Sequence, residues 1–599
     1  MPPATIANLA DARKARPAQD WARALETIGR ATRDPERILT RAIAEWACRY
    51  GDAPALLSDR EDFSFRALEA RMNQYSRWAL DAGVAPGETV ALSMGNRPEY
   101  FAIWLGLIQV GAIVALLSPG LSGPSLIHAL RVARARRVIV AAENAARCME
   151  ELADEKGVEV WIHGAGGSDV RRIDLAVSKQ SGDPLDGVRL PRITLDDRAL
   201  RIFTSGTTGM PKAAEVSHRK LILWTHWFAG LAGFTAEDRH YNCLPMHHSV
   251  GGVVAVGAPL VFGGAAVISE RFSARGFWED ISRWRCTGFQ YIGEFCRYLV
   301  ATPRHSSEQN HCLRIAIGNG LSESVWRSFI QRFGSIRILE FYASTEGNVW
   351  LYNVEGKMGS IGRIPAYLAA QRPLAVARFD HESQTPARAP NGLCEPCADG
   401  DVGEALGRIS GDAGSRFEGY SEQKETDRKI LRNVFKAGDA WMRTGDLMRR
   451  DSQGFFTFVD RIGDTFRWKG ENVSALEVAS VLGSCFGVVD EAIAYGVAIA
   501  GAEGRAGMAL LKTDPRFDLD ALVRRLDGLP RYAWPLFLRL ASEIEKTETF
   551  KPKRSAYVAQ GFDPGVIDDP LYVFIPERQR YTPLDADLYA AIQTGAMRL

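Results

Sequence analysis

Apolar positions along this chain fall into short continuous runs and into longer stretches with helical spacing. The runs at 89–94, 112–117 and 137–141 predict buried strands, and the stretches at 99–109 and 126–134 predict helices. Strands that alternate with helices at this spacing indicate parallel sheets covered by helices. We therefore expect a layered α/β fold.

The same alternation continues on both sides of this region. Residues 38–78 predict helices with a short strand pair at 55–63, and further α/β units follow between 254 and 341. Short alternating strands near 404–409 and 454–459 predict a smaller β subdomain.

The pattern starts again at about residue 463, where charged and glycine-rich residues precede a new set of elements. Helices are predicted at 475–482 and 519–526, with strands at 488–497, 508–511 and 537–540. These elements are enough for a separate compact α+β domain. The expected parts are a tail with a first helix (1–35), a large domain of stacked sheets and helices (36–462) and a small C-terminal domain (463–599).

Composition narrows the class of protein. An apolar content of 46%, a charged content of 24% and a net charge of +1 are typical of a soluble globular protein and give no argument for nucleic acid. The apolar stretch 101–117 contains Gln109 and Gly111, which favours a buried helix and strand over a membrane span. Nine scattered cysteines, with one CxxC at 394–397, favour reduced thiols and a cytoplasmic location over a zinc site. Peripheral contact with the inner face of a membrane and the oligomeric state stay open.

The strongest chemical signal is the string FTSGTTGMPK at 203–212, which follows an apolar run that predicts a strand. Gly206 and Gly209 allow the backbone to turn and expose its N–H groups, and Lys212 adds a positive charge. Four hydroxyl side chains add further donors: Thr204, Ser205, Thr207 and Thr208. This set of donors suits a polyphosphate, although Pro211 before the lysine and Ala213 after it exclude the GxxxxGK[ST] loop.

Three further motifs carry polar groups at the ends of predicted strands. Glu346, within FYASTEGN at 341–348, can hold Mg²⁺ together with phosphates. Asp446, within TGD, can bind both hydroxyls of a ribose, although TGD alone is more often a turn. The string DRIGD at 460–464 joins the two inferred domains, and charged residues around Gly463 suit a hinge.

In this order and spacing, TSGTTGMPK, YASTEG, TGD and the DR pair resemble the adenylate-forming superfamily. Four further strings resemble the fatty acid transport proteins, also called very-long-chain acyl-CoA synthetases: QYIGEFCRY (290–298), IGNGL (317–321), DRIGDTFRWKGENVS (460–474) and RYTPLD (580–585). The resemblance runs from about residue 50 to the end of the chain.

The resemblance implies the adenylate-forming fold, with a large adenylation domain (36–462) and a mobile C-terminal domain (463–599) that rotates between two half-reactions. In the first, a fatty acid carboxylate attacks the α-phosphate of ATP and gives acyl-AMP and pyrophosphate. In the second, the thiol of coenzyme A displaces AMP. ATP, Mg²⁺, coenzyme A and a fatty acid are the implied ligands.

The resemblance also implies roles for individual residues. The β- and γ-phosphates would be held by Thr204, Ser205, Gly206, Thr207, Thr208, Gly209 and Lys212. Thr207 and Glu346 would bind Mg²⁺, Thr345 would lie near the α-phosphate, and Tyr342 would stack on adenine. Asp446 and Arg461 would hold the ribose; a local salt bridge is the alternative. The thioester step would use the loop that contains Trp468, Lys469 and Gly470.

Two catalytic positions rest on weaker matches. LPMHH at 244–248 resembles LPLYH, which implies that His248 gates the acyl pocket; the residues alone favour a core histidine. KTETFK at 546–551 resembles TGTFK with Glu548 in place of glycine, which implies that Lys551 is the adenylation lysine. Lys553, two residues away, is the alternative.

The sequence therefore predicts an ATP-dependent fatty acyl-CoA synthetase for long-chain or very-long-chain acids. Two alternatives remain: an acyl-AMP ligase that loads a carrier protein, and a fatty-acid transport or binding protein without catalysis. A channel-type transporter would need membrane-spanning segments, and no convincing one is present.

Overall fold

The computed structural model describes residues 16–165, 170–185, 190–205, 211–371, 373–380, 383–411, 416–468, 471–489, 492–500, 502, 504–546 and 552–597. Its contacts divide the chain into two units, each described here by itself. Unit 1 comprises Met1–Arg372 and Ile409–Leu431, and unit 2 comprises Pro373–Arg408 and Arg432–Leu599.

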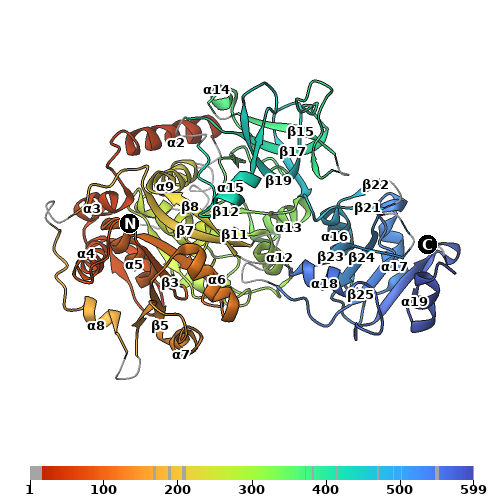
Figure 1. Cartoon of the computed structure of the whole chain (residues 1–599), viewed down its shortest axis with the longest axis horizontal. Coiled ribbons are helices and arrows are strands. Elements are labelled where there is room, and N and C mark those ends of the chain that lie inside the picture. The colour runs from red at the N-terminus through yellow and green to blue at the C-terminus, as the bar shows by residue number, and fades with distance from the viewer. Residues whose placement is uncertain are drawn as a thin grey trace. The chain divides into compact units, whose positions relative to one another are not determined.

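The first sheet of unit 1 has six strands in the order β6-β5-β3-β4-β7-β8 (Figure 1). Their bounds are β6 (Glu159–His163), β5 (Arg137–Ala141), β3 (Thr89–Ser93), β4 (Ile113–Leu117), β7 (Arg198–Ser205) and β8 (Pro211–Ser217). All neighbours are parallel except β7 and β8, which are antiparallel. The strands predicted at 89–94, 112–117 and 137–141 are confirmed.

The second sheet of unit 1 has eight strands in the order β14-β13-β12-β11-β9-β10-β1-β2. Their bounds are β14 (Trp350–Tyr352), β13 (Arg337–Ala343), β12 (Ile315–Asn319), β11 (Gly288–Ile292), β9 (Arg239–Asn242), β10 (Ala265–Ile268), β1 (Pro54–Leu57) and β2 (Phe63–Ser64). The central strands are parallel, and β2 and β14 pair antiparallel at the edges. The expected layered α/β architecture is confirmed.

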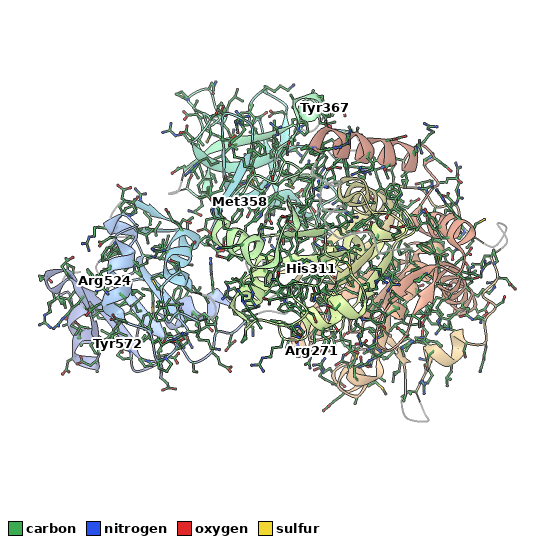
Figure 2. The ribbon with its side chains drawn as sticks, turned by 180° about the vertical axis from the view of Figure 1, so that it is seen from behind. Arg271, His311, Met358, Tyr367, Arg524 and Tyr572 are labelled. Carbon is green, nitrogen blue, oxygen red and sulfur yellow. The ribbon has the colours of Figure 1, made fainter. Side chains whose placement is uncertain are left out.

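Helices connect and cover these sheets. Their bounds are α2 (Pro17–Ala31), α3 (Leu39–Tyr50), α4 (Phe65–Asp81), α5 (Pro98–Gln109), α6 (Gly123–Ala133), α7 (Ala142–Glu151), α8 (Ile173–Val177), α9 (His218–Ala232), the π-helix η1 (Val250–Val254), α10 (Ala255–Leu260), α11 (Phe277–Arg283), α12 (Gly293–Ala301), α13 (Glu323–Phe333), α14 (Ala366–Ala369) and α15 (Gln423–Arg428). Figure 2 shows the side chains from behind, with His311 labelled. The His311 ring precedes β12 and stacks on that of Trp278 at a centroid distance of 5.2 Å.

The apolar stretch 101–117 forms α5 and β4, as predicted. Residues Pro98–Ile108 of α5 and all of β4 are buried. Burial on both faces is expected for a strand inside a parallel sheet, and it explains the continuous apolar run. Within the described parts of the chain, no helix has both the length and the apolar character to cross a bilayer.

Unit 2 contains an antiparallel sheet and a separate mixed sheet. The first is built from β16 (Thr385–Pro386), β15 (Leu374–Asp380), β17 (Val402–Arg408) and β19 (Ala440–Arg450), with β20 (Phe456–Arg461) paired to β19. The chain passes from unit 1 to unit 2 within β18 (Ile430–Arg432). The predicted alternating strands near 404–409 and 454–459 correspond to β17 and β20.

The second sheet of unit 2 has the order β23-β24-β25-β26-β27, beside the hairpin β21-β22. The bounds are β21 (Phe466–Trp468), β22 (Glu471–Val473), α16 (Ala475–Gly483), β23 (Ile493–Val497), β24 (Ala506–Leu511), α17 (Leu519–Leu526), η2 (Arg531–Ala533), β25 (Phe537–Leu540), α18 (Arg554–Gln560), β26 (Leu571–Ile575), η3 (Pro576–Arg578), β27 (Arg580–Pro583) and α19 (Ala586–Gln593). These elements enclose one hydrophobic core that runs from Phe466 to Ile592.

The helix predicted at 519–526 and the strand predicted at 537–540 are confirmed to the residue. The strand predicted at 488–497 is too long, because β23 begins at Ile493 and Val488 forms only an isolated bridge with Thr513. The division into 36–462 and 463–599 differs from the division by contacts and stays a prediction.

Candidate active site

The described residues of the phosphate-loop candidate lie on two antiparallel strands, β7 and β8. Thr204 pairs with Lys212 and Ser205 with Pro211 across antiparallel β7 and β8. The strand predicted to end at Phe203 continues to Ser205, and Pro211 and Lys212, which were expected in the loop, begin the next strand. Pro211 fits this arrangement because the first residue of a strand tolerates proline. The other candidates on this string, Gly206, Thr207, Thr208 and Gly209, lie outside the described residues.

Lys212 is held by a carboxylate at the start of β8. Its Nζ lies 2.5 Å from Oε2 of Glu425 in α15. The hydrogen bond from Lys212 holds the pKa of the Glu425 carboxyl below its ordinary value. A phosphate that binds Lys212 would therefore take the place of Glu425.

The loop after β13 carries Thr345 and Glu346, and three side chains from elsewhere contact it. Lys220 in α9 donates from Nζ to the carbonyl oxygens of Thr345 (3.0 Å) and Glu346 (3.3 Å). Oγ of Ser249 lies 3.1 Å from Oγ1 of Thr345. The carboxylate of Glu346 is 3.9 Å from Nζ of Lys429. The loop therefore presents a hydroxyl and a nearly buried carboxylate in one place.

Tyr420 connects this loop to the hairpin. Its side chain interacts with those of Glu346 and Thr204: burial and then the Glu346 charge raise the pKa of Tyr420, and Thr204 opposes the shift. A bridge between the backbones of Ala214 and Tyr420 places this segment beside β8. Tyr420 thus brings together two residues that the sequence had assigned separately to phosphate and to metal. Sequence reasoning missed Tyr420, Glu425, Lys429 and Lys220, because no local motif links them to either string.

The donor set beside the hairpin fits a magnesium ion held jointly with a nucleotide. Mg²⁺ usually takes one or two protein carboxylates and completes its shell with phosphate oxygens and water. Glu346 supplies one carboxylate, and it is joined to Thr204 through Tyr420. Within the described part of the chain, no group of three or more His, Cys, Asp or Glu side chains could hold a metal alone.

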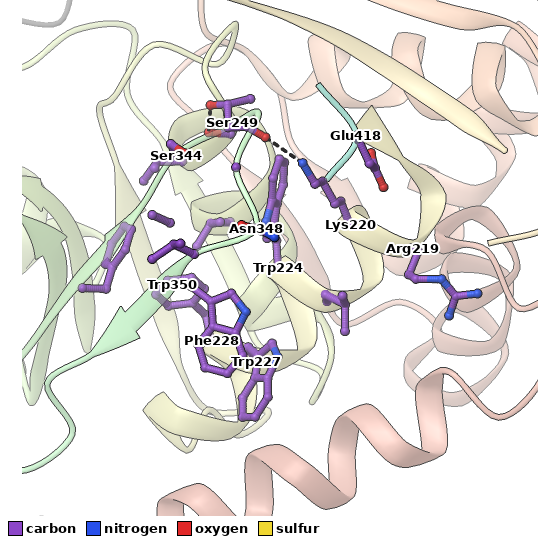
Figure 3. A pocket seen from close by; sticks show the side chains of 18 of the residues that line it. Arg219, Lys220, Trp224, Trp227, Phe228, Ser249, Ser344, Asn348, Trp350 and Glu418 are labelled. Atoms are coloured by element: carbon purple, nitrogen blue, oxygen red, sulfur yellow. Dashed lines mark hydrogen bonds between the residues drawn. The ribbon is translucent and has the colours of Figure 1, made fainter. Parts of the chain in front are cut away.

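A pocket opens next to Thr345 and runs between α9 and β13 (Figure 3). Its cavity volume is about 80 Å³. Lys220, Ser249 and Glu418 lie at one end, and Trp227 and Phe228 lie at the other (Figure 3). The further apolar lining comes from Leu223, Trp224, Val250, Val254, Phe341, Val349, Trp350 and Tyr352. The aromatic lining suits an apolar group whose polar head lies at Thr345.

His248 lies immediately before two residues that line this pocket. Its carbonyl oxygen accepts a hydrogen bond from the backbone N–H of Gly252 (2.7 Å), and its ring lies 4.3 Å from that of His247. Ser249 and Val250, which follow it, both line the pocket. The predicted gating role of His248 stays a prediction.

Tyr342 lies near the end of β13, where it pairs with Leu351 of β14 and is half-buried. The neighbouring Glu340 is fully buried. Its carboxyl is hydrogen-bonded to the Tyr291 hydroxyl and to the backbone N–H of Leu321 (3.1 Å). Burial raises the pKa of Glu340 to about 8. Glu340 therefore attaches the IGNGL segment to β13, close to the position predicted for adenine.

In unit 2, Asp446 and Arg461 are cross-strand partners on β19 and β20. Nε of Arg461 lies 3.6 Å from Oδ1 of Asp446. The structure therefore contains the salt bridge that was the alternative to ribose binding, and the same pairing would present both groups to a diol. The ribose role stays a prediction.

The remaining C-terminal candidates are only partly described. Trp468 ends β21 and is buried. Lys469, Gly470 and Lys551 lie outside the described residues. Nζ of Lys553, the alternative to Lys551, lies 3.3 Å from Oε2 of Glu545 and is half exposed.

Comparison with known proteins identifies the family. A family model described as AMP-binding enzyme matches residues 43–372. Long-chain fatty acid transport protein 1 of Mus musculus is 37% identical over 548 residues, which cover 90% of this chain and 84% of that protein. Long-chain fatty acid transport protein 2 of Rattus norvegicus is 36% identical over 578 residues, which cover 95% of this chain and 92% of that protein.

Solved structures show the same fold. ATP-bound MatB from Rhodopseudomonas palustris superposes with a TM-score of 0.73 at 20% identity, covering 87% of this chain and 98% of that chain. The anthranilate CoA ligase AuaEII in complex with anthranoyl-AMP gives a TM-score of 0.72 at 20% identity, and the match covers 87% of this chain and 96% of that chain. The expected adenylate-forming fold is confirmed, and the chain belongs to the AMP-binding enzymes and, among them, to the long-chain fatty acid transport protein family.

Proposed function

We propose that this chain is an ATP-dependent fatty acyl-CoA synthetase that acts on long-chain or very-long-chain fatty acids. The observation that carries the proposal is the position of Thr345 and Glu346. Thr345 lies at the polar end of an aromatic pocket, Glu346 follows it directly in the chain, and Tyr420 links Glu346 to the hairpin strands that carry Thr204 and Lys212. An apolar acid and a nucleotide triphosphate would therefore meet at one loop.

In the first half-reaction, a carboxylate oxygen of the acid attacks the α-phosphorus of ATP and pyrophosphate leaves. Phosphoryl transfer depends mainly on positioning and on neutralising charge. Lys212 would exchange Glu425 for the β- and γ-phosphates, and Thr345 would donate from its hydroxyl near the α-phosphate. Lys220 would hold the Thr345–Glu346 loop in place through its hydrogen bonds to the two carbonyl oxygens.

A magnesium ion, when bound, would neutralise phosphate charge, and Glu346 with Thr207 would hold it. Lys551 would place a further positive charge at the α-phosphate. In the second half-reaction, the thiol sulfur of coenzyme A attacks the acyl carbonyl and AMP leaves. We propose that Asp446 and Arg461 hold the ribose, and that Trp468, Lys469 and Gly470 serve this step.

The test is a product assay on the purified chain with ATP, Mg²⁺ and a long-chain acid, with and without coenzyme A. We expect AMP release and acyl-CoA only when coenzyme A is present, with acyl-AMP on the protein when it is absent. Acyl transfer to a carrier protein but not to coenzyme A would instead support the ligase alternative. Fatty acid binding with no AMP released would support a transport or binding protein without catalysis.

A further inference from the structure

Helix α2 lies before the residues that match the AMP-binding family model, yet it is built into unit 1. Its first turn begins at Pro17, a favourable position for proline, and its buried side is formed by Asp20, Trp21, Ala24 and Ala31. Figure 1 shows α2 lying over α9, the helix that forms one wall of the pocket.

The contact between α2 and α9 is unusually close. A Cβ atom placed on Gly230 of α9 would lie 2.4 Å from the Cα atom of Ala24, so a side chain there would push the two helices apart. Nε of Arg23 donates to the carbonyl oxygen of Gly230 over 2.6 Å. Asp20 pairs with Arg337 of β13 over 2.8 Å. Helix α2 is therefore attached to α9 and β13, two of the elements that line the pocket.

Trp21 is the side chain that reaches the aromatic end of the pocket from behind. Its ring lies 5.8 Å from that of Trp227, at 79°, and 6.0 Å from that of Tyr352, at 65°. Both partners line the pocket, whereas Trp21 does not. Trp21 is 2% exposed, and the Trp227 ring also lies 5.1 Å from that of Trp350. The end of the pocket is thus a double layer of aromatic rings.

We propose that helix α2, through Trp21, limits the length of the acyl chain that the pocket accepts. The inference rests on the proposed function, because it requires the pocket to hold an acyl chain. Side chains in a close-packed interior leave little free space, so additional methylenes of an acyl chain would have to displace Trp227 or Tyr352. Those two rings cannot move outward while Trp21 fills the space behind them. The maximum length of the acyl chain is therefore set by α2, which lies outside the residues that match the AMP-binding family model.

The experiment compares wild-type protein with Trp21→Ala across saturated fatty acids from medium to very long chain. Two quantities are measured: the affinity for each free acid by calorimetry, and kcat/KM for acyl-CoA formation. We expect Trp21→Ala to gain about tenfold or more for acids just beyond the wild-type limit, since each methylene in an apolar pocket is worth about that much. Trp21→Phe, which keeps a ring behind Trp227, should retain the wild-type profile.

The matched control is Trp78→Ala. Trp78 is 3% exposed and packs edge-to-face on Trp161 at 5.1 Å, and neither ring lines the pocket. Its loss should lower stability without changing the chain-length profile. If Trp21→Ala does not fold, Trp21→Leu supplies the same comparison with a smaller cavity.

The outcomes separate the two proposals. A wild-type chain-length profile in folded Trp21→Ala or Trp21→Leu, with only a lower melting temperature, would overturn the role of α2. A shifted binding profile in a protein that releases no AMP would support the role of α2 and overturn the synthetase proposal. Equal shifts of the chain-length profile in Trp21→Ala and Trp78→Ala would also overturn the role of α2, since they would show a general effect of lost packing.

Discussion

The ammonium group of Lys220 donates a hydrogen bond to the carbonyl oxygen of Thr345 over 3.0 Å, from a buried position in α9. Burial lowers the pKa of Lys220, and the charges of Glu418 and Glu346 oppose that shift. A buried lysine without good partners is costly, so these carbonyl contacts are important to its stability. They also make the active-site loop depend on α9.

We expect Lys220→Met to lower kcat/KM for ATP by about a hundredfold. The methionine keeps most of the volume but leaves the carbonyl oxygens of Thr345 and Glu346 without this donor, and a displacement of about 1 Å at a catalytic group can cost that much. Steady-state kinetics with ATP varied would measure the loss. Lys220→Arg should recover part of it. Wild-type kinetics in folded Lys220→Met would show that Lys220 does not position the loop.

Glu346→Gln should raise the Mg²⁺ concentration needed for half-maximal AMP release. A neutral amide is a poorer ligand for a hard cation than a carboxylate. A magnesium titration of the adenylation rate measures the effect, and Glu323→Gln is the matched control because Glu323 pairs with Arg327 on the exposed side of α13 and does not line the pocket. The same magnesium requirement in wild-type and Glu346→Gln protein would remove Glu346 from the metal site.

Glu425→Gln should tighten ATP binding by about twofold to fivefold. The carboxylate of Glu425 competes with phosphate for Lys212. Exposed ion pairs are worth about 0.2–1 kcal/mol, and we take that range for the competition. Calorimetric titration with ATP would measure the change. Weaker binding in this variant would mean that Glu425 orders Lys212 for the nucleotide instead of competing with it.

Local patterns predicted elements well and long-range contacts poorly. The helix at 519–526 carries its apolar residues at helical spacing and has Asp518 as N-cap, so its bounds follow from nearby residues. Strand β8 was missed because Lys212, Ala213 and Ala214 show no alternation, and the pairing with β7 is what makes this segment a strand. Tyr420 could not be assigned, since its role depends on a contact with residues about two hundred positions earlier.

The buried carboxyl of Glu340 should make the free energy of unfolding decrease as the pH rises. Its pKa of about 8 in the folded protein lies above the ordinary value of 4.5, so the folded state holds the proton more tightly. The stabilisation is complete below about pH 4.5 and is lost as the pH rises through about 8. Thermal melts of wild-type and Glu340→Gln protein between these values should diverge, with the wild type losing more. Parallel melting curves would show that folding does not raise the pKa of Glu340.

The last prediction concerns Gly463, the proposed hinge residue. Its φ is +96°, and a Cβ atom there would meet no heavy atom within 4 Å, so Gly463→Ala is opposed by backbone strain and not by packing. The N–H of Asp464 bonds to the carbonyl oxygen of Arg461 over 3.0 Å and closes this turn. Alanine disfavours such a conformation by about 1–2 kcal/mol.

If φ at residue 463 changes between the two half-reactions, Gly463→Ala should bias the protein toward one orientation by about fivefold to thirtyfold. One single-turnover rate, for acyl-AMP formation or for transfer to coenzyme A, should then fall much more than the other. Gly454→Ala is the matched control, because Gly454 has φ of +80° and equally open space. Its strain should lower the melting temperature without separating the two rates. The hinge assignment fails if Gly463→Ala behaves in the same way, with both rates falling together as stability falls.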